Sequence, residues 1–202
     1  MSALELSTLT LATAPVGIGP LPPLRPTADL HAVEVQGTDG DQGIDEEMAA
    51  NLAYGRVPSV LPYLPQDAYD RTLVDVAHPV AVLSNERLRA TFLLGQGGRL
   101  WSLIDLVTGR ELLYANAALQ PGNLALRNAW FAGGVEWNLG TTGHHPLTCE
   151  PLHAARIRLP DGSAGLRLWE YERMRELVFQ IDAWLPDGAA QLAVQVTVTN
   201  VT

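Results

Sequence analysis

The chain has 202 residues, which is long enough to bury a core as one large domain or two small ones. Hydrophobic residues make up 47% of it and charged residues 17%, and this composition excludes a disordered or fibrous protein. All thirteen basic residues are arginine, which excludes a lysine Schiff base and a phosphate-binding P-loop. The net charge of −9 lies mostly in residues 1–70, where ten acids meet two arginines. Without a basic stripe, such a surface repels phosphates, so nucleic acid is excluded as a partner.

The compartment is indicated by the single cysteine and the N-terminus. Cys149 permits no internal disulfide and fits a reducing environment. The first fifteen residues carry Glu5 and no basic side chain, and their apolar residues alternate with polar ones. That pattern is neither a secretory signal nor a membrane span. We therefore expect a cytoplasmic protein with no membrane partner.

Residues 1–70 are predicted to form a strand, a proline-rich arm and acidic loops, all packed on a β-sandwich formed by residues 71–202. The alternating leucines of Ala3–Leu11 favour a strand with one buried edge. Prolines between residues 14 and 26 exclude a helix or a central strand there, because each removes a backbone donor and fixes φ. The arm is therefore expected to lie extended across the sandwich.

From Arg71 onward, short aliphatic and β-branched runs alternate with Gly, Pro and Asn turn signals. This pattern predicts an all-β fold, an antiparallel β-sandwich, in which the tryptophans on strands (Trp101, Trp169 and Trp184) belong to the core. Because the last strand leaves a sheet edge to be covered, we expect the chain to be the N-terminal portion of a longer protein. The predicted strands are Arg71–Val76, Val80–Ser84, Arg87–Leu93, Arg99–Asp105, Arg110–Tyr114, His153–Leu159, Leu166–Met174, Glu176–Leu185 and Gln191–Thr199.

Residues 115–150 lack periodicity and are rich in Asn, Gly, Trp and His, which is typical of a functional loop region. Indole faces stack on the apolar side of a pyranose ring, while carboxylates, amides and imidazoles bind its hydroxyl groups. The loop region 121–150 is therefore predicted to hold a sugar. The candidate substrate-binding residues are Asn123, Arg127, Trp130, Trp137 and Asn138, and the candidate catalytic residues are Glu136, His144 and His145.

Other interpretations of these residues stay open. A carboxylate between Val135 and Trp137 can be held by a structural partner, and a loop histidine is more often structural than catalytic. The histidines at 144, 145 and 153 and Cys149 have loosely ligand-like spacing, but no compact zinc pattern supports a metal site. We therefore predict neither a metal nor a cofactor.

Three motifs carry a resemblance to a known family. They are Gly97–Asp105 (GGRLWSLID), Thr108–Tyr114 (TGRELLY) and Gly133–Asn138 (GGVEWN), followed by His144 and Pro146. Together they resemble an uncharacterised family of galactose-mutarotase-like domains, which commonly opens a long protein whose later part consists of tetratricopeptide repeats. The resemblance implies a β-supersandwich that binds carbohydrate on the concave face of one sheet, and a helical repeat region further along the full-length protein.

The leading functional hypothesis is a carbohydrate-binding domain for a neutral sugar or oligosaccharide. One alternative is a glycoside hydrolase or sugar epimerase, with Glu136 as general base and a histidine or Glu150 as acid. A second alternative is a non-catalytic interaction scaffold that precedes helical repeats. A second carboxylate facing Glu136 would favour the enzyme, and the sequence does not place one.

Overall fold

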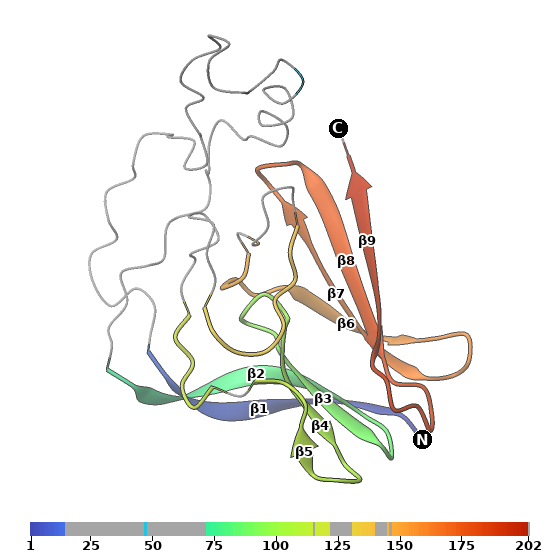
Figure 1. Cartoon of the computed structure of the whole chain (residues 1–202). Helices are drawn as coiled ribbons and strands as arrows, with labels where there is room; N and C mark the ends of the chain where they lie inside the picture. Colours follow the sequence, from blue (N-terminus) through green and yellow to red (C-terminus); the bar gives the residue numbers. More distant parts are fainter. Residues whose placement is uncertain are drawn as a thin grey trace.

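The structure of this chain, a computed structural model, describes residues 1–14, 47, 72–114, 116–121, 131–139, 145 and 147–201. Its strands form two antiparallel sheets, one with the order β1-β2-β3-β4-β5 and one with the order β6-β7-β8-β9 (Figure 1). The prediction of an all-β antiparallel sandwich is therefore confirmed. The strands are β1 (Ala3–Thr13), β2 (Val74–Ser84), β3 (Leu88–Leu93), β4 (Arg99–Asp105), β5 (Arg110–Glu111), β6 (His153–Arg158), β7 (Ala164–Glu172), β8 (Leu177–Trp184) and β9 (Ala193–Asn200).

The N-terminal strand is an integral part of the first sheet, since all eleven residues of β1 pair with β2. β2 itself differs from the prediction of two strands, because it runs without a break through His78 and Pro79. The carbonyl of Pro79 accepts the backbone N–H of Leu94, so its nitrogen faces the same side, just beyond the last β2–β3 pair, and the carbonyl of Leu94 there accepts the N–H of Leu152 instead. The missing N–H therefore costs no ladder bond, and the proline is tolerated inside a strand.

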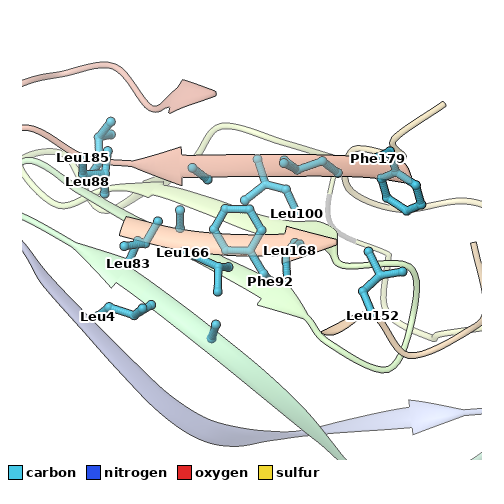
Figure 2. Packing of buried hydrophobic residues seen from close by; sticks show 14 of the residues in the cluster. Leu4, Leu83, Leu88, Phe92, Leu100, Leu152, Leu166, Leu168, Phe179 and Leu185 are labelled. Atoms are coloured by element: carbon cyan, nitrogen blue, oxygen red, sulfur yellow. The ribbon is translucent and has the colours of Figure 1, made fainter. Parts of the chain in front are cut away.

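The main core lies between the two sheets, where side chains from both inner faces interdigitate (Figure 2). The first sheet contributes fully buried residues such as Leu83 and Phe92, and the second contributes Leu168 and Ile181. These side chains occupy alternate positions of their strands, which is why the period-two pattern of the sequence locates them.

A second, smaller core covers the opposite face of the first sheet and consists of Val80, Leu93, Trp101, Leu119 and Phe131. Trp101 reaches it through a β-bulge, because Thr91 pairs with Ser102 and Phe92 pairs with Leu100, which leaves Trp101 between them. The prediction that Trp101 belongs to the core is confirmed.

The same prediction is wrong for Trp169 and Trp184, which are half-buried. Trp169 alternates with the buried Leu168, so its side chain lies on the outer face of the second sheet and stacks on His153 at 5.4 Å. Trp184 pairs with Gly165 on that same outer face. Because these strands carry apolar residues on both faces, their sequence alone does not indicate which face is inside.

The proline-rich arm after Ala14 and nearly all of the acidic loops lie outside the described residues, so their predicted packing stays a prediction. Within the ranges that are described, no helix is long and apolar enough to cross a bilayer.

Candidate functional site

The segment of residues 131–139 lies alongside the start of β4. Its first residue, Phe131, belongs to the second core. Further along, Val135 forms an antiparallel bridge with Leu100, donating its N–H to the Leu100 carbonyl at 2.8 Å. The indole Nε1 of Trp137 donates to the carbonyl of Gly98, also at 2.8 Å. These contacts fix the segment to the first sheet and leave its end, from Glu136 onward, facing the second sheet.

A pocket lies between this segment and the inner face of β8 and β9. Glu136 and Trp137 form one side, and Val196 on β9 contributes to the other. Its volume of about 90 Å³ equals roughly three waters and is below the roughly 300–1,000 Å³ of a drug-sized ligand site, so it can hold only part of a ligand. The lining residues are Glu136, Trp137, Asn138, Leu139, His145, Phe179, Ile181 and Val196.

Arg99, at the start of β4, holds the pocket segment in place. One terminal nitrogen donates to the Gly133 carbonyl at 2.7 Å, and the other to Thr148 Oγ1 at 3.1 Å and to Glu136 Oε2 at 3.5 Å. The guanidinium carbon lies 3.9 Å from the centre of the Phe131 ring, a cation–π contact. Since Arg99 is only 2% exposed, it acts as an internal cross-link between residues 131–136 and residue 148.

Glu136 is held from two sides. Its side chain is 11% exposed, and one carboxylate oxygen forms the ion pair with Arg99. The other oxygen accepts the backbone N–H of His145 at 3.3 Å. The cationic partner of this carboxylate is thus an arginine 37 residues earlier in the chain. Its charge is balanced, and Arg99 of the first sheet helps to hold the side chain in place.

His145 contributes a buried imidazole. The residue is 2% exposed, and its ring meets Phe179 edge-on with centroids 4.8 Å apart. Neither ring nitrogen has a hydrogen-bond partner, and neither is accessible to solvent, in the part of the chain that the structure describes. Burial, with a smaller contribution from the charge of Arg175, lowers the pKa of His145 to about 3, so the ring is neutral at neutral pH.

Mild acid is expected to destabilise the fold through His145. Its folded pKa of about 3 lies below the ordinary value of 6.5, so the unfolded chain takes up a proton first as the pH falls. The free energy of unfolding does not depend on this group above about pH 6.5. Between pH 6.5 and pH 3 it decreases as the pH falls, with a slope approaching 1.4 kcal/mol per pH unit. Urea unfolding at pH 7 and pH 5.5 measures the difference.

His145→Phe keeps a ring against Phe179 but cannot titrate, so its free energy of unfolding should change less between the two pH values. His153→Gln, at a histidine whose side chain is 63% exposed, is the matched control and should behave as the wild type. Equal pH dependence of the wild type and His145→Phe would show that His145 is not the group responsible.

Four predicted site residues lie together at the pocket: Glu136, Trp137, Asn138 and His145. Four others, Asn123, Arg127, Trp130 and His144, lie outside the described residues and remain predictions. Glu150 belongs to the turn after Leu147 and does not line this pocket. No group of three or more metal-ligating side chains gathers among the described residues.

Sequence reasoning missed the residues that reach the pocket from elsewhere in the chain. Arg99 stood in a recognised motif, but a single arginine before a strand carries no signal of burial. Phe179 and Val196 were predicted on strands, yet nothing local indicates that residues 136–139 lie over them. The available signal was the carboxylate of Glu136 in a chain without lysine, which made one of the thirteen arginines a candidate for its partner.

Comparison with known proteins identifies one family. The model of a family described as "Domain of unknown function (DUF5107)" matches residues 56–201, most of the chain. A solved structure, that of a TPR-domain containing protein from Parabacteroides distasonis ATCC 8503, superposes with a TM-score of 0.70 at 19% sequence identity. The match covers 98% of this chain and 29% of that one, so this chain spans less than a third of the other protein's length. At this identity the likeness shows a shared fold.

Proposed function

This chain belongs to the DUF5107 domain family, and we propose that it binds a neutral carbohydrate in the pocket beside Glu136. The observation that carries the proposal is that three residues line one pocket: Trp137, the exposed Asn138, and Glu136, which is held by Arg99. An indole offers a stacking face to a sugar ring, while the amide and carboxylate can bond its hydroxyl groups. The resemblance to galactose-mutarotase-like domains supports the same proposal, because it implies a sugar on the inner face of a sheet.

Several features favour binding over catalysis. Glu136 is the single carboxylate among the described residues that line the pocket, whereas most glycoside hydrolases use two. Its charge is already paired with Arg99, which disfavours its use as a free general base. The ring nitrogens of His145 are closed off from solvent, so this histidine, among the described residues, is poorly placed to act as an acid of the epimerase kind.

The charge and size of the pocket define the ligand further. The net charge of −9 repels anionic sugars, which favours a neutral ligand. Stacking on one indole contributes about 0.5–1.5 kcal/mol beyond area burial, so binding in the millimolar to micromolar range is expected. A pocket of about 90 Å³ fits one part of a sugar, with the remainder of an oligosaccharide outside it.

Asn138→Ala is expected to weaken binding of neutral oligosaccharides about tenfold, which corresponds to 1.4 kcal/mol. Asn138 is exposed at the pocket, so its truncation removes a ligand contact with little effect on the fold. Titration calorimetry or NMR titration against a panel of neutral glycans measures the change.

The matched control is Gln120→Ala, which removes an exposed amide next to Leu119 of the second core, on the other side of the first sheet. It should bind as the wild type does. Trp137→Phe, which loses the bond to Gly98 but keeps an aromatic ring, should bind more weakly than Gln120→Ala. A wild-type protein that binds no neutral glycan, or an Asn138→Ala variant with unchanged affinity, would refute the proposal.

A further inference from the structure

The wall of the pocket that the second sheet forms is apolar. It consists of Phe179, Ile181 and Val196, and the first two belong to the main core at 3% and 1% exposed. His145 adds no accessible polar group beside this wall, because its ring meets Phe179 edge-on and its nitrogens are closed off from solvent. A sugar hydroxyl placed against such a wall loses its hydrogen bonds to water without replacement. The wall therefore favours an apolar group of the ligand.

The polar groups of the pocket come from the loop segment that faces this wall. Asn138 is exposed there, and its amide can donate a hydrogen bond to a carbonyl oxygen. The side chain of Glu136 is 11% exposed and adds a carboxylate, a group that accepts up to about four hydrogen bonds. One pocket thus combines an apolar wall with a donor and an acceptor on the facing side.

We propose that the ligand is an N-acetylated hexosamine whose acetamido group enters the pocket, an inference that rests on the carbohydrate binding proposed above. An acetamido group ends in a methyl and also carries an amide N–H and a C=O. Its methyl packs against the apolar wall of β8 and β9. Its C=O accepts a hydrogen bond from the side chain of Asn138, and its N–H donates to the carboxylate of Glu136.

The size of the pocket fits this group. Its volume of about 90 Å³ equals roughly three waters, and the acetyl part of the group has about as many non-hydrogen atoms. The pyranose ring is too large to enter and stays outside, against the indole of Trp137. A hydroxymethyl group would bring a hydroxyl to the apolar wall, and the carboxylate of a uronic acid would be repelled by Glu136, so neither matches both sides of the pocket.

NMR titration of the 202-residue chain tests the proposal with N-acetylglucosamine, N-acetylgalactosamine and N-acetylmannosamine, each beside its parent hexose and its free hexosamine. Oligomers of glucose and of N-acetylglucosamine with the same linkage extend the panel. At least one N-acetylated sugar is expected to bind at least about tenfold more tightly than its parent hexose, because it alone fills the apolar wall. The free hexosamine lacks the methyl and carries a positive charge, so a preference for it would show attraction to the acidic chain and overturn the proposal.

Two further outcomes separate this inference from the proposed function. A chain that binds neutral glycans but prefers no N-acetylated form overturns the inference and leaves carbohydrate binding intact. A chain that binds no neutral glycan, N-acetylated or not, refutes both.

Val196→Thr tests where the acetamido group lies, because it keeps the shape of the side chain and places a hydroxyl in the apolar wall. It should weaken binding of the preferred N-acetylated sugar at least about threefold and leave binding of the parent hexose little changed. Val194→Thr is the matched control, since this valine lies on the same strand and face but does not line the pocket. Threonine is favoured in strands, and circular dichroism verifies that both variants are folded. Equal losses for the two sugars, or for the two variants, overturn the placement of the acetamido group against β9.

Discussion

Replacing Arg99 with alanine is expected to lower the free energy of unfolding by about 3–5 kcal/mol. The guanidinium is 2% exposed and hydrogen-bonds the carbonyl of Gly133, the hydroxyl of Thr148 and the carboxylate of Glu136. Its removal leaves Glu136, whose side chain is 11% exposed, without its cationic partner. Burying a charge without compensation is among the largest costs that a single substitution can cause. Urea unfolding monitored by tryptophan fluorescence measures the loss.

Two further variants assign this cost to the ion pair. Arg99→Ala/Glu136→Gln removes both charges, so it should be more stable than Arg99→Ala alone by about 1 kcal/mol or more, a coupling that a double-mutant cycle isolates. Arg158→Ala is the arginine control. Its guanidinium bonds the Gly162 carbonyl in an exposed position, and its loss should change stability by no more than about 0.5 kcal/mol. Equal effects of Arg99→Ala and Arg158→Ala would show that the buried cluster is not a stabilising element.

The same substitution is expected to weaken glycan binding at temperatures where the protein is still folded. Arg99 does not line the pocket, but it fixes the carbonyls and the carboxylate that position residues 133–136. Arg99→Lys preserves a positive charge yet cannot reproduce a planar group that bonds several partners at once and lies over the ring of Phe131. It should therefore recover only part of the stability.

The strands could be predicted because their signals are local. Arg99–Asp105 was predicted with the bounds of β4, since glycines precede it and alternation runs through it. β9 was predicted within two residues at its start and one at its end, from the alternating valines of Gln191–Thr199. The same pattern could not show that these valines are exposed, because exposure depends on what covers the sheet.

The site could be predicted only on the side formed by its loop. Glu136, Trp137 and Asn138 stand together in the sequence and lie together at the pocket. The opposite wall of the pocket comes from β8 and β9, more than forty residues further along the chain. The arginine that holds the loop in place, Arg99, comes from β4. Such contacts follow from how the two sheets pack, and one sequence by itself carries no signal for a particular long-range pair.

Gly134 is the position of the pocket segment where a small change is expected to have the largest effect on the backbone. Its φ is +66°, in the left-handed region that disfavours side chains. A Cβ there would lie 2.2 Å from the carbonyl oxygen of Leu100, which accepts the N–H of Val135. Both atoms of that hydrogen bond belong to the backbone, so neither can move aside without separating residues 133–136 from β4.

Gly134→Ala should therefore destabilise the protein by at least about 3 kcal/mol, since backbone strain adds to the steric clash. Gly109→Ala is the matched control, because φ at Gly109 is +70° and no atom lies within 4 Å of the added Cβ. It carries the strain without the clash and should cost about 1–2 kcal/mol. Urea unfolding of the two variants isolates the clash as the difference. If both lose the same stability, the close approach of Gly134 to β4 is not required for the fold, and the pocket segment is held to the first sheet by its hydrogen bonds to Arg99, Leu100 and Gly98.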